Sequence, residues 1–350
     1  MCEEITNVNG KDFQKNFKIS GKPYIFDEDK NGFPAFTPIN FERINFIIHH
    51  DSNYRPLKED GSDSISETIK NRIRKDKNIE DYSCDYDDIL KVVRVIDKLN
   101  STRQSSLGPK IKWEKDQKSN QDKDELGRKI TACYISTIEN FYKRLEEGDP
   151  KLVDDIAKNA ISPESTKKAI EAGKIEESGW NEEKINSVSR YTFSFASKYC
   201  TYMARAIFEK KNGEDGYCIF DKVMCDMLPY YAWVYLGNKG DKDDKGEYIR
   251  EKKRKTDIVG EQHPIPSSKI KSRIKDVFAN KNDSKYEDYR NLIDDIIHAA
   301  ECLYCREYPG KQCHITRKDF DHLLWYYFKG GNPEIERALK LVGKESALLR

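Results

Sequence analysis

Apolar residues recur at the spacing of an α-helix along most of the chain after residue 127, whereas the first hundred residues show a mixed pattern. Residues 87–99 have the pattern of an amphipathic helix, and further helices are predicted over 130–145, from Ser162, over 182–193, over 285–306 and after Thr316. Near the N-terminus, Tyr24-Ile-Phe and Ile44-Asn-Phe-Ile-Ile are typical of short strands, with a turn signal at Lys30-Asn-Gly. We therefore predict a mainly α-helical protein with a small mixed α/β N-terminal region.

Polar stretches suggest where the chain divides. Residues 101–126 are rich in Ser, Lys, Asp and Gln and contain few apolar side chains, which is typical of a linker or surface loop. Residues 238–256 form a second charge-dense stretch that is typical of an insertion. The predicted division is a mixed N-terminal region over 1–100, a linker or surface loop over 101–126, and a helical domain over 127–350.

Composition limits the class of protein. The 350 residues include 62 Lys and Arg against 61 Asp and Glu, so the net charge of +1 neither favours nor excludes nucleic acid as a partner. No apolar run has the length of a membrane span, so we predict no membrane partner. Nine cysteines and the absence of an export signal at the N-terminus indicate reduced thiols. We predict a cytoplasmic protein, and the sequence does not indicate its oligomeric state.

Lys198 lies in a sequence pattern that favours a nucleophilic amine. The stretch from Ser189 to Phe208 has the pattern of a helix, a tight turn and a second helix, with Ser197 as the N-cap and Lys198 at the first helical position. The positive end of a helix dipole and partial burial both lower the pKa of a lysine. A lysine with a lowered pKa can form a Schiff base with an electrophilic carbon. The alternative is an ordinary solvated lysine.

Asp221 precedes a second apolar helix that begins at Lys222, after a loop marked by Asn212-Gly213. The residue type and position predict an N-cap. A carboxylate held at a helix start can also stabilise an oxocarbenium-like centre, as carboxylates do beside glycosidic bonds. Capping alone is the alternative, and the two roles are compatible.

These two segments carry a resemblance to a known family. The runs Phe193-Ser-Phe-Ala-Ser-Lys-Tyr199 and Tyr217-Cys-Ile-Phe-Asp-Lys-Val223 resemble the catalytic segment of the helix-hairpin-helix DNA glycosylases, and are most similar to the 8-oxoguanine DNA glycosylase branch. The run Asp319-Phe-Asp-His-Leu-Leu-Trp-Tyr-Tyr-Phe-Lys329 resembles a C-terminal motif of bacterial proteins with this fold. The resemblance covers about residues 160–330.

The resemblance implies a fold, an activity and a site. The helical domain would be a helix-hairpin-helix glycosylase-like domain that acts on duplex DNA with a damaged or modified base, without a cofactor. Lys198 would be the nucleophile at C1′ of the sugar, and Asp221 would assist departure of the base. Predicted contacts to DNA are made by Ser194, Ser197, Tyr199 and Arg205. The family's hairpin contains glycines, whereas the stretch from Ser194 to Ser197 contains none.

We therefore predict a DNA N-glycosylase that works through a lysine Schiff base, an intermediate that also permits β-lyase activity; the sequence does not decide whether that second activity exists. Two alternatives from other classes stay open. One is a nucleic-acid-binding or interaction protein that keeps the scaffold without catalysis. The other is a HEPN-like ribonuclease, because Arg317 and His322 resemble the active-site motif of that helical family.

Four side chains near the C-terminus have the chemistry of zinc ligands: Cys302, Cys305, Cys313 and His314. The competing interpretation is that Cys302 and Cys305 are core positions of an apolar helix. A zinc site usually shows two clear ligand pairs in loops. We therefore predict no metal.

Overall fold

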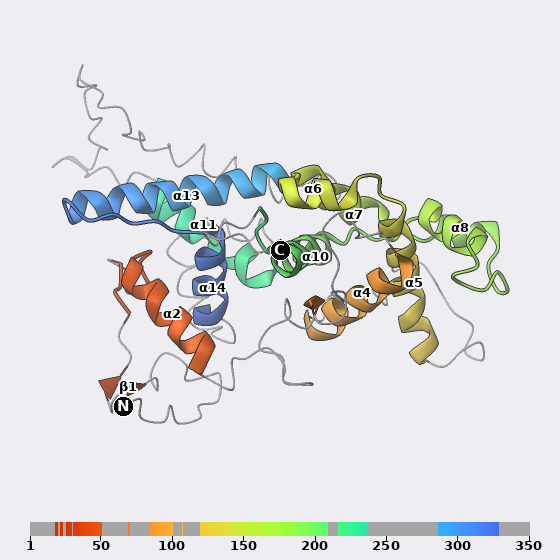
Figure 1. Cartoon of the computed structure of the whole chain (residues 1–350), viewed down its shortest axis with the longest axis horizontal. Helices are drawn as coiled ribbons and strands as arrows, with labels where there is room; N and C mark the ends of the chain where they lie inside the picture. Colours follow the sequence, from red (N-terminus) through yellow and green to blue (C-terminus); the bar gives the residue numbers. More distant parts are fainter. Residues whose placement is uncertain are drawn as a thin grey trace, which may run out of the picture. The chain divides into compact units, whose positions relative to one another are not determined.

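The computed structural model describes residues 18–19, 22–23, 26–29, 31–50, 69–70, 85–100, 107, 120–208, 216–236 and 286–328. This part of the chain is mainly helical, which confirms the predicted class (Figure 1). The chain divides into two compact units. Unit 1 combines Met1–Tyr54, Asp221–Asn280 and Asp288–Arg350, and unit 2 combines Arg55–Phe220 and Lys281–Glu287. Both units therefore join segments that are far apart in the sequence.

Unit 1 begins with two short strands, β1 (Lys18–Ile19) and β2 (Lys22–Pro23), which pair antiparallel. The next element is helix α2 (Pro38–His50), so the prediction of a strand at Ile44–Ile48 is wrong. Thr37 accepts a hydrogen bond from the amide of Asn40 (3.3 Å) and thereby caps the helix, with Pro38 at its first position. The apolar residues that suggested a strand are close enough in sequence to fit a buried helix equally well.

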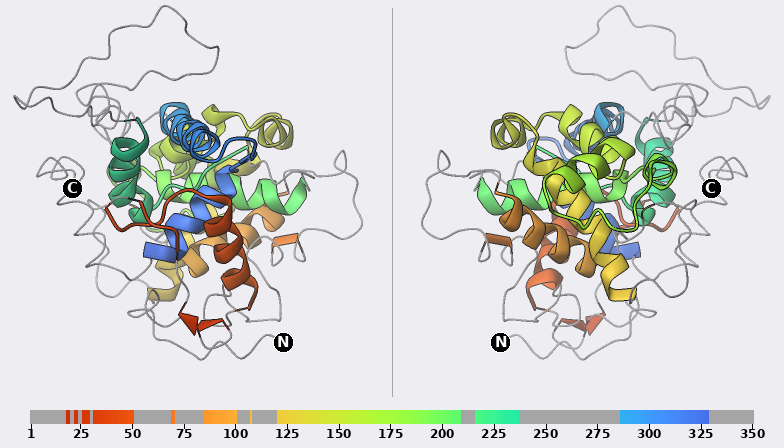
Figure 2. Two further views of the ribbon diagram at one scale, coloured as in Figure 1. Left: turned by 90° about the vertical axis from the view of Figure 1, so that its left-hand side faces the viewer. Right: turned by 90° about the vertical axis from the view of Figure 1, so that its right-hand side faces the viewer.

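The core of unit 1 is aromatic. Helix α14 (Arg317–Phe328) packs against α2 and against α11 (Lys222–Leu236), and Figure 2 shows α14 beside α2. The ring of Phe36 stacks on Tyr231 with centroids 4.5 Å apart and on Tyr235 at 5.0 Å. Tyr230 donates a hydrogen bond to Asp29 (2.5 Å), which ties the turn before α2 to α11. Most of α13 (Tyr286–Glu307) also belongs to this unit.

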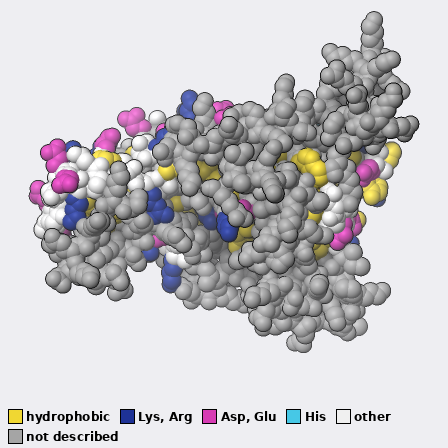
Figure 3. Space-filling model, turned by 180° about the vertical axis from the view of Figure 1, so that it is seen from behind, with side chains coloured by type: hydrophobic (Ala, Val, Ile, Leu, Met, Phe, Trp, Pro, Cys, Tyr) yellow, Lys and Arg dark blue, Asp and Glu magenta, His cyan; other side chains and the backbone are white. Residues whose placement is uncertain are grey.

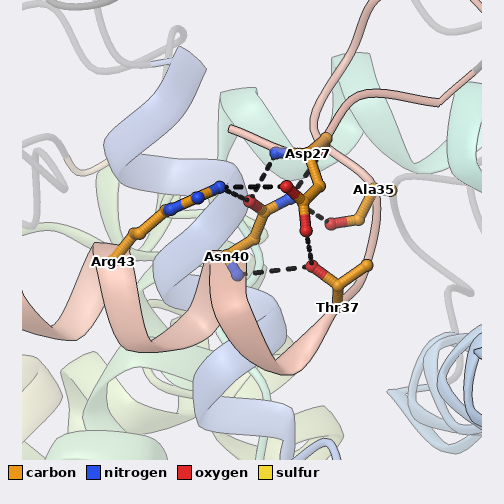
Figure 4. Close-up of polar contacts among 5 residues, drawn as sticks. All are labelled: Asp27, Ala35, Thr37, Asn40 and Arg43. Carbon is orange, nitrogen blue, oxygen red and sulfur yellow. Dashed lines mark hydrogen bonds and ion pairs between the residues drawn. The ribbon is translucent and has the colours of Figure 1, made fainter. Parts of the chain in front are cut away.

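Asn40 joins the loop before α2 to the helix itself (Figure 4). Its side-chain amide donates to the carbonyls of Asp27 (2.8 Å) and Ala35 (2.7 Å), and its carbonyl oxygen accepts from the amide of Asp27 (2.9 Å). Arg43 pairs with the carboxylate of Asp27 at 3.1 Å. Asn40 is fully buried, and these bonds satisfy both ends of its amide group.

Unit 2 is a set of packed helices. They are α4 (Tyr86–Asn100), α5 (Asn120–Ser136), α6 (Phe141–Glu147), α7 (Pro150–Asn159), α8 (Pro163–Glu171), α9 (Glu182–Asn186) and α10 (Phe193–Ile207). Helix α5 packs on α4 and α8, and α10 packs on α7, α4 and α6. The element that carries Lys198 therefore lies among several helices.

Two helix boundaries in unit 2 differ from the prediction. Helix α5 begins at Asn120, inside the range 101–126 that was predicted as a linker or surface loop. Long-range packing explains this difference, because Leu126 and Ile130 are buried and Arg128 pairs with the buried carboxylate of Asp97 at 2.9 Å.

The helix predicted over 130–145 is interrupted between Ser136 and Phe141. The hydroxyl groups of Ser136 and Thr137 donate to carbonyls three residues earlier, at 2.8 Å and 2.7 Å, and so compete with helical hydrogen bonds. Asn140 then adopts a left-handed conformation with φ of 52°. The chain therefore turns here, and α6 starts in a new direction.

Candidate active site on helix α10

Helix α10 starts earlier than the sequence predicted. It runs without interruption from Phe193 to Ile207, with Thr192 as its N-cap residue, so the turn predicted at Ser194–Ser197 is helical. Lys198 therefore lies in the second turn of α10, and the predictions that Ser197 caps the helix and that Lys198 is its first residue are wrong. The helix before it, α9, ends at Asn186 rather than near 193. A turn does separate two helices here, but it spans 187–192.

Burial explains why the helix extends through these residues. Every position of α10 from Phe195 to Thr201 is buried, so all sides of this stretch are covered. Within such a buried stretch, packing outweighs the preference of serine for an N-cap position. Local sequence signals alone place the start of such a helix poorly.

Lys198 is a buried residue with slight access to solvent. It is 7% exposed, whereas its neighbours Ser197 and Tyr199 are fully buried. Residues four apart share one side of a helix, so Ser194, Lys198 and Tyr202 lie along one stripe of α10, which Arg205 continues. The flanking members of this stripe, Ser194, Tyr202 and Arg205, are only partly buried. Lys198 is thus a buried position within a stripe whose other members are partly exposed.

The solvent exposure of the α10 residues also bears on the predicted contacts to DNA. Ser197 and Tyr199 are fully buried in unit 2, and their contacts to nucleic acid stay predictions. Tyr199 packs on Phe195 and Phe141, with ring centroids 5.5 Å and 6.2 Å apart, and acts as a core residue. Ser194 and Arg205 are partly exposed, and their contacts to DNA stay predictions.

Ser197 links α10 to the segment that leads to Asp221. Its hydroxyl oxygen accepts a hydrogen bond from the amide of Phe220 at 3.0 Å and donates to the carbonyl of Ser194 at 3.2 Å. Phe220 also packs its ring edge-to-face on Phe193, with centroids 4.7 Å apart. A longer contact of 3.5 Å runs from the same hydroxyl to the carbonyl of Phe220, so the residue before Lys198 and the residue before Asp221 are joined by hydrogen bonds.

Further bonds hold the residues upstream of Phe220. The Tyr217 hydroxyl donates to the carbonyl of Arg144 at 3.1 Å. The hydroxyl of Tyr286 accepts from the amide of Cys218 (2.5 Å) and donates to the carbonyl of the same residue (2.8 Å). We call Tyr217–Phe220 the anchored segment. The side chain of Tyr217 bonds to α6, and the backbone of Cys218 and Phe220 bonds to the start of α13 and to α10.

Two glycines let this segment approach α6. Gly148 ends α6 in a left-handed conformation (φ of 68°), and a Cβ atom added there would lie 3.1 Å from the Cα atom of Gly216. A Cβ atom on Gly216 would lie 3.0 Å from the Cα atom of Gly148. The two backbones touch directly, which requires glycine at both positions.

We expect Gly148→Ala to destabilise the protein by about 2–4 kcal/mol, because alanine adds left-handed strain and a backbone clash at once. Gly173→Ala is the matched control, since Gly173 also has a positive φ (63°) but has no atom within 4 Å of an added Cβ. The control should lose only the strain, about 1–2 kcal/mol. Urea unfolding of both variants measures the difference, and equal losses would contradict the close contact with Gly216.

Asp221 is the N-cap of α11, as the sequence predicted. Its carboxylate oxygen Oδ1 accepts a hydrogen bond from the amide of Met224 at 3.0 Å, and its carbonyl accepts from the amide of Cys225 at 2.9 Å. The residue is 9% exposed. A carboxylate in this position is held by the backbone of the helix it starts, so its orientation is set within unit 1.

The arginine and histidine of the ribonuclease alternative lie on α14. Arg317 donates two hydrogen bonds to the carboxylate of Asp294, both at 2.6 Å. His322 is half-buried. Thr316 caps α14, because its hydroxyl accepts from the amide of Asp319 (3.1 Å) while the carboxylate of Asp319 bonds back to its amide (3.0 Å). The bidentate pair gives Arg317 a structural role.

The cysteines near the C-terminus do not form a ligand cluster. Within the part of the chain that the structure describes, no three His, Cys, Asp or Glu side chains are arranged to hold a metal ion. Cys302 Sγ lies 3.6 Å from Nε2 of His298, and His314 lies 3.6 Å from Glu301. Burial raises the pKa of Cys313 to about 12, so its thiol is protonated at neutral pH.

No protein-family model, curated protein or solved structure matches this chain. Among the described residues, no helix combines the length and the apolar character needed to cross a membrane. On the face drawn in Figure 3, Lys and Arg side chains of the described residues are interspersed with Asp and Glu side chains.

Proposed function

We propose that this protein is a DNA N-glycosylase with an associated lyase activity, in which Lys198 is the nucleophile and Asp221 supports the developing charge. The observation that carries the proposal is the burial of Lys198 in α10, where the residue keeps slight access to solvent. The hydrogen bond from Phe220 to Ser197 adds support, because it ties the neighbour of the lysine to the neighbour of the aspartate.

The chemistry follows from a buried amine. Burial disfavours the charged ammonium form, and only the neutral amine can attack carbon. A bond forms between Nζ of Lys198 and C1′ of the sugar, while the bond from C1′ to the base nitrogen breaks and the base leaves with that electron pair. Loss of a proton from the new nitrogen and opening of the sugar ring give a Schiff base. β-Elimination of the 3′-phosphate then cleaves the strand.

Asp221 is assigned the electrostatic role. Positive charge develops on the sugar as the base leaves, and a nearby carboxylate stabilises such an oxocarbenium-like centre. The N-cap bond to Met224 uses one oxygen of the carboxylate and fixes its direction.

The substrate is duplex DNA with a damaged or modified base. An enzyme that acts at C1′ must take the target nucleotide out of the stack, which costs a few kcal/mol and favours weakly paired bases. Ser194 and Arg205 are partly exposed on the same stripe of α10 as Lys198, and we assign them to the flanking phosphates. Contacts of this type position the strand and carry little sequence information.

A panel of duplex oligonucleotides, each with one defined lesion, tests the proposal. Incubation with borohydride reduces a Schiff base to a stable covalent adduct, which denaturing electrophoresis resolves from free DNA. We expect an adduct and base release on at least one lesion, and none on the undamaged duplex. Absence of both on every lesion would favour a non-catalytic scaffold. RNA cleavage that is lost in His322→Ala but retained in Lys198→Met would support the ribonuclease instead.

A further inference from the structure

We propose that Cys302 and Cys305 are a peroxide-sensitive thiol pair, in which Cys302 is oxidised first and Cys305 then closes a disulfide within helix α13. His298 completes the site by accepting the proton of Cys302. All three residues belong to unit 1, so the inference does not depend on the roles proposed for Lys198 and Asp221.

The three side chains lie along one face of α13. Positions 298, 302 and 305 are separated by four and then three residues, a spacing that places side chains above one another on a helix. His298 and Cys305 are exposed and Cys302 is partly buried, so neither cysteine is a core position. Both cysteines are thiols in this structure. An oxidant dissolved in water can therefore reach the pair.

Cys302 has the contact that a first oxidation step needs. Its Sγ atom lies 3.6 Å from Nε2 of His298. Partial burial, and next the charge of Glu301, raise the pKa of Cys302, so its thiol is mainly protonated at neutral pH. The thiolate is the nucleophilic form, so the proton must be removed as the sulfur reacts. An imidazole that carries its own proton on Nδ1 leaves Nε2 as the acceptor for the thiol proton.

The chemistry balances with hydrogen peroxide as the oxidant. As the proton of Cys302 moves to His298, the sulfur attacks one peroxide oxygen, an S–O bond forms and the O–O bond breaks. Hydroxide leaves and takes up that proton to become water, and Cys302 is now a sulfenic acid. The thiolate of Cys305 attacks this sulfur, so that an S–S bond forms and the S–O bond breaks. The second hydroxide takes the proton of Cys305, and the two thiols have lost the two electrons that the peroxide gained.

The helix makes this disulfide strained. Cβ atoms three residues apart on a helix are separated by about 5–6 Å, whereas a disulfide needs about 3.5–4.5 Å. Closure therefore has to distort α13 between the two cysteines, close to its end at Glu307. In the affected turn, the amide of Tyr308 donates to the carbonyl of Tyr304 at 2.9 Å. Oxidation should weaken this bond, and the strain should keep the disulfide easy to reduce.

Cys313, in the segment after α13, is the matched control. Burial raises its pKa to about 12, which leaves little thiolate to attack a sulfenic acid. We therefore expect Cys313→Ser to form the disulfide within α13 at the wild-type rate.

Mass spectrometry of the full-length protein tests the pair. Reduced protein is treated with hydrogen peroxide, alkylated under denaturing conditions and digested with trypsin. We expect the peptide from Asn291 to Arg306, which holds both cysteines, to lack alkyl groups and to be lighter by two hydrogens than its reduced form. Dithiothreitol before alkylation should reverse the change. Two alkylated thiols in that peptide after peroxide, or a link from either cysteine to Cys313, would overturn the proposal.

Two variants test the order of the steps. Cys305→Ser should stop the reaction at a sulfenic acid on Cys302, which dimedone traps. His298→Asn should slow the loss of thiols by at least about tenfold and still give the same disulfide, because the imidazole only takes the proton. The Tyr308 amide should exchange faster in the oxidised protein than in the reduced protein. An unchanged rate in His298→Asn, or no dimedone adduct on Cys302, would contradict the assigned roles.

Discussion

Lys198→Met abolishes the borohydride-trapped adduct and lowers base release by at least about a thousandfold, because methionine offers no nitrogen to attack C1′. Methionine matches the aliphatic part of lysine in length and fills the same space in α10, so the variant should keep its helical circular dichroism. Loss of activity without loss of fold would separate the chemical role of the amine from its packing.

Lys222→Met is the matched control for this substitution. Lys222 is exposed at the start of α11 and follows Asp221 directly, so its removal tests whether any nearby positive charge is sufficient. We expect wild-type adduct yield from this variant. An adduct that persists in Lys198→Met would show that another amine reacts, and a Lys198→Met protein that unfolds would show that the buried lysine is structural.

Asp221→Asn is expected to slow base release by about 10²- to 10³-fold, because the amide keeps the shape of the side chain but carries no negative charge toward the sugar. Asparagine is as good an N-cap as aspartate, so the bond to the Met224 amide and the stability should both be retained. Single-turnover kinetics and urea unfolding measure the two effects separately.

Asp221→Ala provides the comparison. Loss of the cap should cost about 1 kcal/mol of unfolding free energy, and the rate should fall at least as far as in Asp221→Asn. If Asp221→Asn releases base at the wild-type rate while Asp221→Ala is merely less stable, then Asp221 has a capping role alone. That outcome would leave Lys198 without its proposed electrostatic partner.

Several elements were predictable because their signals are local. Helix α4 begins and ends close to the predicted positions, and α8 and α14 begin close to theirs, since their apolar residues repeat at helical spacing. Capping residues were also found from sequence. Ser162 caps α8 through the amide of Ser165 (3.2 Å), and Asp221 caps α11. Each of these features depends on residues within one or two turns of each other.

Other features depend on partners that are distant in sequence. Ser197 has the residue type of a cap, but Phe220 and the packing around α10 give it a buried bond inside the helix. The short apolar run of α2 fits a strand or a helix equally well, and burial of Phe41 and Ile44 together favours the helix. A local pattern therefore found the residues of interest but misplaced the start of the element that holds Lys198.

The candidate site also combines features that are local in sequence with features that depend on distant residues. Lys198 and Asp221 were identified from short motifs and residue chemistry. The anchored segment is held by Arg144, Ser197 and Tyr286, and no sequence pattern connects these three positions. Gly148 and Gly216 gave no signal either, because their contact arises from the packing of two backbones. Tertiary contacts of this kind hold the anchored segment in place, and a local sequence pattern does not reveal them.

The most direct measurement of the central claim is the location of the covalent link. Wild-type protein trapped with borohydride on its best lesion duplex is digested with protease and nuclease, and mass spectrometry identifies the lysine that carries the sugar remnant. We expect the remnant on Lys198, within the peptide from Tyr191 to Arg205. A remnant on another lysine or on the N-terminal amine, or the absence of any modified peptide, would contradict the proposed mechanism.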